Sequence, residues 1–142
     1  MSSDQRNGDT PGDGLSATGI SPTFTADDLQ ASIRFYTEGL GFEITERHEV
    51  EGALRFVRLR SGRALLGVGQ DDFAKGRDRK KGVGMRIWIS TTQDVGRLAE
   101  RAKASGYTLT TEAGPLPWGP QAFSLADPDG FQITVVEGEE PS

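Results

Sequence analysis

The sequence predicts an α+β domain made of two similar βαβββ modules. The order of one strand, one helix and three further strands can be followed twice along the 142 residues. Similar segments follow the two expected helices: residues 41–45 are GFEIT and residues 106–110 are GYTLT. A chain of this length fits one domain, and internal repetition is stronger evidence of a fold than any single motif.

The first module is expected over residues 19–71. Apolar and polar side chains alternate from Ile20 to Thr25, which is typical of a strand with one face toward the core. Asp27 and Asp28 can accept hydrogen bonds from backbone N–H groups at a helix start. The helix is expected to bury a stripe of Leu29, Ile33, Tyr36 and Leu40 and to end at Gly39 and Gly41. Strands are predicted over residues 42–48, 54–59 and 64–68, with turns at Glu51-Gly52 and Ser61-Gly62.

The second module is expected over residues 85–138, after a connector at residues 72–84. Five cations make the connector basic, and both a solvated surface and an anion-binding role are compatible with them: Lys75, Arg77, Arg79, Lys80 and Lys81. In the first strand, Met85, Ile87 and Ile89 alternate with Arg86, Trp88 and Ser90. The helix should bury Val95, Leu98, Ala99 and Ala102, with a cap at Thr91 or Thr92 and an end at Gly106. Strands are predicted over residues 107–111, 122–126 and 131–136.

The composition excludes several classes of function. A formal charge of −5 argues against a protein dedicated to nucleic acid, which needs clustered positive charge. Cysteine is absent, so neither disulfides nor thiolate metal sites can form. No apolar run approaches the roughly 20 residues of a membrane span, and no signal-peptide pattern begins the chain. We therefore expect a cytoplasmic protein without membrane contact, with a disordered polar tail at residues 1–18 and one domain at residues 19–138.

Three motifs carry a resemblance to a known family. Residues 28–36 begin with DL and end with IRFY, residues 39–42 are GLGF, and residues 127–133 are DPDGFQI. With these motifs, residues 20–137 resemble the vicinal oxygen chelate superfamily of glyoxalases, bleomycin resistance proteins and extradiol dioxygenases. The resemblance implies that each module curls its strands into a half-barrel, with helices on the convex side and ligands on the concave side. The alternation along the strands agrees with this arrangement.

The resemblance also implies where a metal ion would be bound. In the metal-dependent members, four inward-facing strand positions supply ligands of the His or Glu type to one divalent ion. These positions correspond here to Ser21, Leu66, Arg86 and Thr134. None of the four is a usual metal ligand, and Arg86 would put a permanent cation where the ion should lie. We therefore predict no metal, no other cofactor and no catalytic residue.

The concave side is expected to bind a small molecule. The candidate ligand-binding residues are Ser21, Thr23, Phe56, Arg86, Trp88, Trp118 and Thr134. Aromatic and hydroxyl side chains suit a planar or aromatic ligand, held by stacking and a few hydrogen bonds. The metal-free bleomycin-resistance branch sequesters antibiotics in a groove shared by two chains. Resemblance to that branch implies a homodimer and a role in antibiotic resistance.

Several residues keep two interpretations each. His48 lies among glutamates, which fits either a solvated strand edge or an acid–base or ligand role. Trp118, in the proline-rich residues 114–120, either covers the cavity mouth or seals the core. Arg86 either binds an anionic or aromatic ligand or is neutralised by a glutamate of the second strand or of a partner chain. Residues 127–130 have the composition of a turn, so we assign them a structural role only.

Three functions remain open from the sequence. The first is a metal-independent protein that binds a small molecule. The second is a metal-dependent lyase or dioxygenase of the same superfamily, which would need a divalent ion to polarise its substrate. The third is an interaction module whose cavity is filled by its own side chains. Fold alone does not choose among them.

Overall fold

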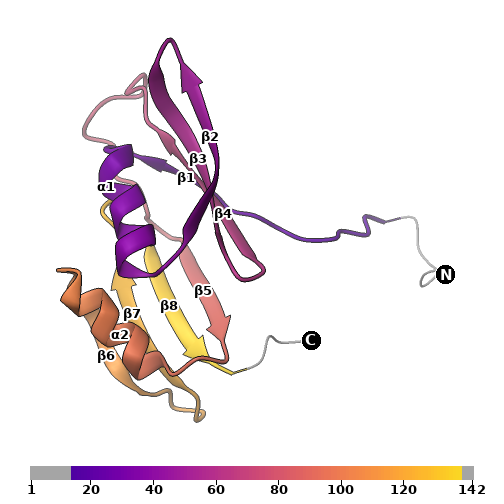
Figure 1. Ribbon diagram of the computed structural model, residues 1–142, viewed down its shortest axis with the longest axis vertical. Coiled ribbons are helices and arrows are strands. Elements are labelled where there is room, and N and C mark those ends of the chain that lie inside the picture. The colour runs from indigo at the N-terminus through magenta and orange to yellow at the C-terminus, as the bar shows by residue number, and fades with distance from the viewer. Residues whose placement is uncertain (1–13, 139–142) are drawn as a thin grey trace.

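Two four-stranded mixed sheets form the framework of the protein. The structure, a computed structural model, describes residues 14–138. The first sheet has the order β1-β4-β3-β2 and the second the order β5-β8-β7-β6 (Figure 1). The strands are β1 (Thr23–Ala26), β2 (Glu43–Val50), β3 (Ala53–Ser61), β4 (Ala64–Gln70), β5 (Arg86–Thr91), β6 (Leu109–Pro115), β7 (Gln121–Ala126) and β8 (Gln132–Glu137). Each sheet pairs its first and last strands in parallel and its other neighbours antiparallel, which confirms the two predicted βαβββ modules.

The first helix begins where the sequence predicts and ends in a wider winding. Helix α1 (Leu29–Arg34) is capped by Asp28, whose carboxylate accepts the backbone N–H of Ala31 at 3.3 Å. The chain then continues as a π-helical turn, η1 (Phe35–Gly39). Three members of the predicted apolar stripe are buried, namely Leu29, Ile33 and Tyr36.

The second helix starts later than predicted. Helix α2 (Val95–Ala104) is capped by Asp94, whose carboxylate accepts the backbone N–H of Gly96 at 2.9 Å. The predicted caps, Thr91 and Thr92, are wrong. Strand β5 continues through Thr91 by pairing with β8, so the helix begins only after the chain has turned away from the sheet.

Two strands differ from their predicted extents. Strand β1 begins at Thr23, because its parallel pairing with β4 begins there, and Ile20 is 95% exposed. Strand β6 runs to Pro115, where it still pairs with β7, and not only to residue 111. The proline-rich loop is therefore limited to residues 116–120. The other strand boundaries agree with the prediction within two residues.

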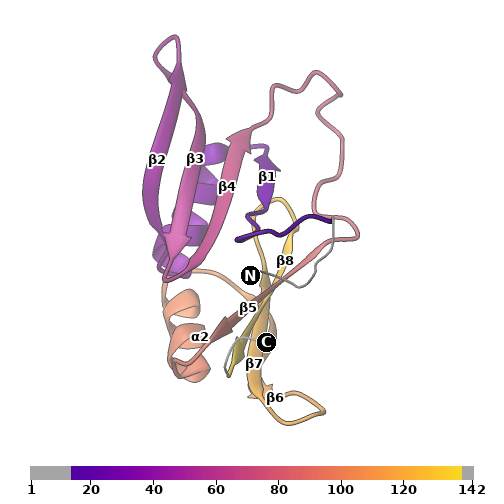
Figure 2. The ribbon, with the colours of Figure 1, turned by 90° about the vertical axis from the view of Figure 1, so that its right-hand side faces the viewer.

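The helices and one face of each sheet share one hydrophobic core. Aromatic rings from both modules meet in it. Phe24 of β1 stacks on Phe131, with ring centroids 4.4 Å apart, and Phe35 of η1 meets Tyr107 edge to face at 4.9 Å. Figure 2 shows α1 behind the first sheet, so the sheet face turned to the viewer carries no helix. This arrangement agrees with the expected helix-covered convex side and open concave side.

The chain before β1 has no regular structure from residue 14 onward. The predicted disordered tail, residues 1–18, lies for the most part outside the described residues. No helix within residues 14–138 is long and apolar enough to cross a membrane.

Candidate ligand-binding site

The uncovered sheet faces carry the residues that the sequence assigns to ligand binding. Strand alternation puts Phe24, Val57 and Ile133 in the core, so the side chains next to them turn to the opposite face. The predicted residues on or beside that face are Ser21, Thr23 and Phe56 in the first module and Arg86, Trp88, Trp118 and Thr134 in the second. All are exposed except Phe56, which is half-buried, and Thr134, which is buried. These residues therefore line open sheet faces and not a closed cavity.

The metal position that the resemblance implies in β4, Leu66, is wrong by one residue. Leu66 is only 3% exposed and belongs to the core. Its neighbour Gly67 lies opposite Thr23 in the parallel pairing of β1 with β4. The prediction rests on counting residues from the turn glycine. Because successive side chains in a strand point to opposite faces, an error of one residue in that count assigns the residue to the wrong face of the sheet. Gly67, and not Leu66, thus lies on the uncovered face at this position of β4.

The ring of Phe56 fills the space that a side chain at this β4 position would take. A Cβ atom added to Gly67 would lie 2.6 Å from Cζ of Phe56 and 3.4 Å from Oγ1 of Thr23. A Cβ atom added to Gly69 would also be next to this ring, 3.6 Å from Cδ1 of Phe56. The two glycines therefore leave room for an aromatic ring against the first sheet.

The residues at the four metal positions do not fit a divalent ion. The corrected set is Ser21, Gly67, Arg86 and Thr134. Two hydroxyls, a glycine and a guanidinium offer neither imidazole nor carboxylate, the donors that such ions take in proteins. Within the described part of the chain, no group of three or more His, Cys, Asp or Glu residues could hold a metal. The donor chemistry therefore argues against a metal centre on these faces.

Two tryptophans stack on each other at the second sheet. The rings of Trp88 in β5 and Trp118 have centroids 6.2 Å apart and planes inclined by 17°. Their exposures are 47% and 67%, so Trp118 does not seal the core, which was one of its two interpretations. The backbone of the 116–120 loop is closed by a hydrogen bond of 2.7 Å from Leu116 N–H to the carbonyl of Pro120. The loop thus holds an indole ring in solvent beside a second one.

A pair of hydroxyls lies beside Trp88. Thr134 is the partner of Trp88 in the parallel pairing of β5 with β8. The hydroxyls of Thr134 and Ser124 share a hydrogen bond of 2.9 Å. Each hydroxyl has one donor and two acceptor sites, so the pair keeps one proton and further lone pairs for a ligand.

Arg86 begins β5 with an exposed side chain. Among the residues that the structure describes, none forms a hydrogen bond or ion pair with its guanidinium. Neutralisation by a glutamate of the second strand is therefore wrong. Neutralisation by a partner chain stays a prediction. An unpaired guanidinium can bind a carboxylate, a phosphate or an aromatic face.

His48 belongs to a second aromatic patch, on the first sheet. Its ring is 5.7 Å from that of Phe56, and Nε2 lies 3.3 Å from a carboxylate oxygen of Glu46. The imidazole is 61% exposed. The patch of His48 and Phe56 thus presents aromatic surface to solvent, as the tryptophan pair does on the other sheet.

The turn at residues 127–130 links the two modules, which agrees with its predicted structural role. Tyr36 donates a hydrogen bond of 2.7 Å to Asp127, and the hydroxyl of Ser32 donates one of 3.3 Å to Asp129. Burial raises the pKa of Asp127, and hydrogen bonds from Tyr36 and the backbone lower it in part. Burial and the nearby Asp127 charge raise the pKa of Tyr36, so the phenol keeps its proton and remains a donor.

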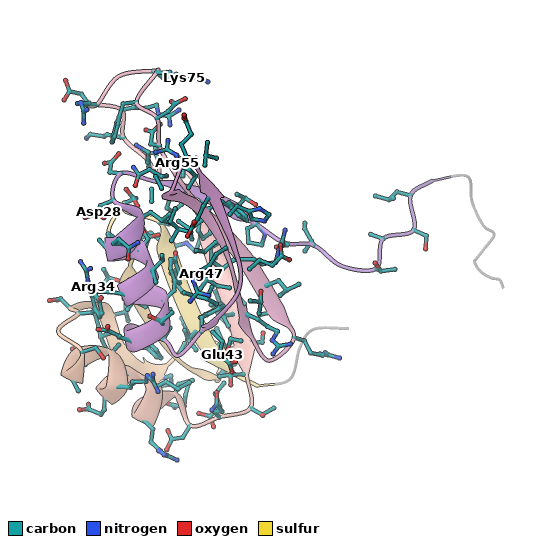
Figure 3. All side chains as sticks on the ribbon, turned by 45° about the horizontal axis from the view of Figure 1, so that its top comes forward. Asp28, Arg34, Glu43, Arg47, Arg55 and Lys75 are labelled. Carbon is teal, nitrogen blue, oxygen red and sulfur yellow. The ribbon has the colours of Figure 1, made fainter. Side chains whose placement is uncertain are left out.

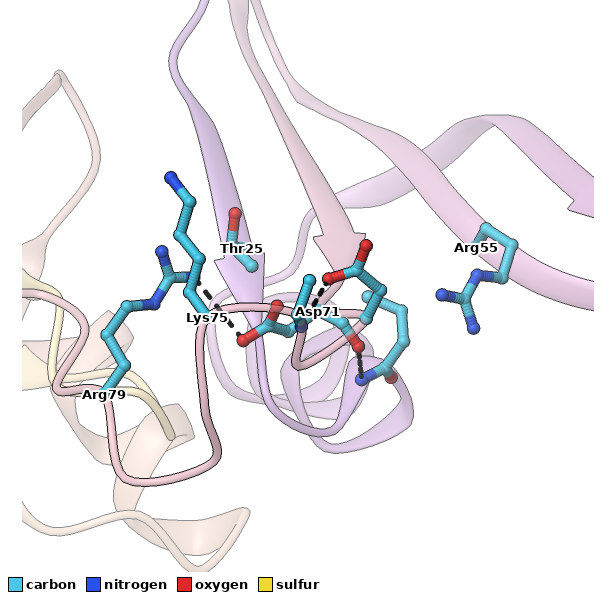
Figure 4. A pocket seen from close by; sticks show the side chains of 8 residues that line it. Thr25, Arg55, Asp71, Lys75 and Arg79 are labelled. Atoms are coloured by element: carbon cyan, nitrogen blue, oxygen red, sulfur yellow. Dashed lines mark hydrogen bonds and ion pairs between the residues drawn. The ribbon is translucent and has the colours of Figure 1, made fainter.

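A separate pocket of about 380 Å³ lies at the end of the first sheet, where the connector leaves β4 (Figure 4). It is lined by Thr25, Arg55, Gln70, Asp71, Asp72, Ala74, Lys75 and Arg79. The prediction of ligand-binding residues included none of these. The basic composition of the connector could have pointed to Lys75 and Arg79 as binding residues. Arg55 carried no signal, because it lies at an irregularity in the pairing of β2 with β3 that periodicity does not reveal.

Two open sheets, each with a helix on one face and aromatic side chains on the other, define a protein of the paired βαβββ class. Residues 20–135 match the Glyoxalase/Bleomycin resistance protein/Dioxygenase superfamily. The chain belongs to this superfamily, as its resemblance predicted.

Curated relatives carry the name of one enzyme. Lactoylglutathione lyase of Haemophilus influenzae is 28% identical over 117 residues, which cover 79% of this chain and 86% of that protein. Lactoylglutathione lyase GLX1 of Arabidopsis thaliana is 27% identical over 124 residues, which cover 80% of this chain. The match spans only 42% of the length of that plant protein.

Solved structures share the fold. A superfamily member from Sphaerobacter thermophilus is 28% identical, with a TM-score of 0.66, and the match covers 87% of this chain and 98% of that one. TioX from Micromonospora sp. ML1 has a TM-score of 0.70 at 16% identity, over 85% of this chain and 98% of that one. At that identity the likeness concerns the fold alone.

Proposed function

We propose that this protein binds a planar, aromatic small molecule without a metal ion. The observation that carries the proposal is the exposed stack of Trp88 and Trp118 on the uncovered face of the second sheet. Large aromatic surfaces in water favour contact with another apolar, flat surface. A ring placed against the indoles would gain about 0.5–1.5 kcal/mol from ring geometry in addition to the area it buries.

Neighbouring groups would orient such a ligand. The guanidinium of Arg86, unpaired among residues 14–138, can donate hydrogen bonds to a carboxylate or stack on a ring, and the hydroxyl pair beside Trp88 can make hydrogen bonds. Phe56 and His48 offer a second aromatic surface on the first sheet. A few polar groups around apolar surface are typical of sites for small molecules.

Sequestration of an antibiotic or aromatic metabolite by a homodimer is the specific form of this proposal. The support is the openness of the site. Four large apolar side chains are exposed on or beside β5 and the tryptophan loop, namely Val83, Met85, Trp88 and Trp118. A second chain over this surface would convert an open face into a groove.

The test is a binding screen that uses the fluorescence of the two tryptophans, which are the whole tryptophan content of the chain. For a compound that quenches, we expect Trp88→Ala and Trp118→Ala each to weaken binding about 5- to 150-fold in calorimetry, since loss of a buried aromatic contact costs about 1–3 kcal/mol. Val50→Ala is the control, because Val50 is exposed on β2, away from the pair. Unchanged affinity in both tryptophan variants would exclude this surface as the site.

Metal independence has its own test. We expect purified protein to contain less than a stoichiometric amount of divalent metal, and we expect a chelator to leave ligand affinity unchanged. About one tightly bound ion per chain would overturn this part of the proposal, because the four strand positions would then have to supply ligands that their side chains lack.

Lactoylglutathione lyase activity is the second candidate. The observation in its favour is the 28% identity to proteins of that name over most of their length. Divalent metals should be added one at a time in the assay. We expect no turnover with any of them. Turnover that a chelator abolishes would replace the binding proposal with this one.

A further inference from the structure

The residues that line the pocket at the end of the first sheet include neither the two tryptophans nor Phe56 and His48. Three of its lining side chains are cationic: Arg55 comes from β3, and Lys75 and Arg79 come from the connector. Figure 3 shows Arg55 and Lys75 at the same end of the molecule, away from Arg34 and Glu43. Such clustering stands out in a chain whose formal charge is −5.

Asp71, one of two carboxylates in the lining, is paired with Arg79 and with Lys81, and Lys81 is also paired with Asp27. Its Oδ2 lies 2.9 Å from Nζ of Lys81 and 3.4 Å from Nη2 of Arg79. The side chains of Asp71 and Lys81 are only 7% and 5% exposed. The hydrogen bond from Lys81 is the main reason why the pKa of Asp71 lies below its usual range. Asp71 therefore helps to hold the connector through its pairing with Lys81 and Arg79.

The second carboxylate, Asp72, shapes the same loop. Its Oδ1 accepts the backbone N–H of Ala74 at 2.9 Å. Further along, the guanidinium of Arg77 lies over the ring of Phe73, 4.3 Å from its centroid. The connector is thus held in place by side-chain contacts, which position the backbone that carries Lys75 and Arg79 before any ligand arrives.

Arg55 and Lys75 are the cations in the pocket without a partner. Neither side chain makes a hydrogen bond or ion pair with any residue between 14 and 138. In Figure 4, Arg55 lies on one side of Asp71, whereas Thr25, Lys75 and Arg79 lie on the other. The pocket therefore has two cationic ends, and the carboxylate between them is already paired with Lys81 and Arg79.

We propose that this pocket binds a small polyanion that carries at least two carboxylate or phosphate groups. One group binds Arg55, and another binds Lys75 with help from the free donors of Arg79 and the hydroxyl of Thr25. A volume of about 380 Å³ accommodates a small molecule of this kind. The site does not depend on aromatic binding, so either proposal can fail without the other.

Calorimetry at low ionic strength tests the site with two probes that contain no ring, pyrophosphate and citrate. Saturable binding of either one is expected, and the tighter probe identifies the preferred anionic group. We expect Arg55→Gln and Lys75→Gln each to weaken that binding about tenfold, the effect of about 1.4 kcal/mol from a charged hydrogen bond. Acetate, with one charge, should bind more weakly than citrate.

Matched controls distinguish the pocket from general surface charge. Arg60→Gln changes an exposed arginine of the same strand, and Lys80→Gln changes an exposed lysine of the same connector, and neither residue lines the pocket. Both should bind the probe as the unmodified protein does, and circular dichroism should show all four variants folded. Equal weakening in all four variants would overturn the proposal, and so would the absence of saturable binding of both probes.

Discussion

The phenol of Tyr36 donates a hydrogen bond of 2.7 Å to the carboxylate of Asp127, and this bond joins the helix of the first module to the last turn of the second. Tyr36 is fully buried and Asp127 is 5% exposed. Asp127 also accepts the backbone N–H groups of Asp129 and Phe131, each at 2.9 Å. The turn that belongs to the family motif is therefore a joint between the modules.

Loss of the phenol hydroxyl should weaken this joint. In Tyr36→Phe, the buried carboxylate loses one donor while its two backbone donors remain, so we expect a loss of about 1–3 kcal/mol in the free energy of unfolding. Urea denaturation measures it. Tyr107→Phe is the control, because the Tyr107 hydroxyl has no hydrogen-bond partner among residues 14–138. A Tyr36→Phe variant as stable as the control would contradict the role of the bond.

The titration of Asp127 should appear in the pH dependence of stability. Burial raises its pKa in the folded state, whereas the unfolded chain has an aspartate pKa of about 3.9. Between these two values the folded state binds more protons, so the contribution of Asp127 to the free energy of unfolding falls as pH rises. In Asp127→Asn this titration is absent.

The difference between the unmodified protein and Asp127→Asn in the free energy of unfolding should therefore decrease from about pH 4 upward and level off above the raised pKa. Urea denaturation at several pH values measures it. A difference that increases with pH would mean that hydrogen bonds to the carboxylate outweigh its burial.

Gly82 should tolerate no side chain, because it packs against the turn of the second module. A Cβ atom there would lie 2.4 Å from the backbone carbonyl carbon of Gly130, and φ is 69°. We expect Gly82→Ala to cost about 2–4 kcal/mol, from overpacking and backbone strain together. Gly84→Ala has the same strain, with φ of 76°, but no atom within 4 Å, and should cost about 1 kcal/mol. Equal losses in thermal denaturation would show that only the backbone conformation matters.

The contact between Phe56 and Gly67 should be visible in the spectrum of the single histidine. Gly67→Ala places a Cβ atom 2.6 Å from Cζ of Phe56, so the ring must move, and its ring current on His48, 5.7 Å away, must change. Gly69→Ala is the matched control, since its Cβ atom would be at an ordinary 3.6 Å. Proton NMR of the His48 ring measures the shift. An unshifted resonance in Gly67→Ala would contradict the placement of Phe56 over β4.

Local patterns predicted most of the fold. The stripe of Leu29, Ile33 and Tyr36 and the cap Asp28 determine the first helix, because their partners lie within one or two helical turns. The second helix shows the limit of such reasoning. Thr92 can also cap a helix, but the pairing of β5 with β8 holds the chain in the sheet through Thr91, so the helix starts later and Asp94 becomes the cap.

The candidate site depended more on long-range contacts. The sequence identified Trp88 and Trp118 as residues of interest, but only the structure brings their rings together, since residues 89–117, which include the loop, lie between them. The face of Leu66 could not be settled by counting from a turn. Its pairing with Leu59 and its place in the core reverse the expectation and assign the uncovered position to Gly67.

By itself, the sequence determined the repeated βαβββ order, the family and the lack of metal ligands at the family positions, because these follow from periodicity, motifs and residue chemistry along the chain. Only the tertiary structure decided that the aromatic surfaces are open and that a charged pocket joins Arg55 to the connector. The physical reason is that these features depend on contacts between segments that are apart in the sequence. Strand register, burial and ion pairs such as that of Asp71 with Lys81 form only when the chain has folded, so no local sequence pattern predicts them.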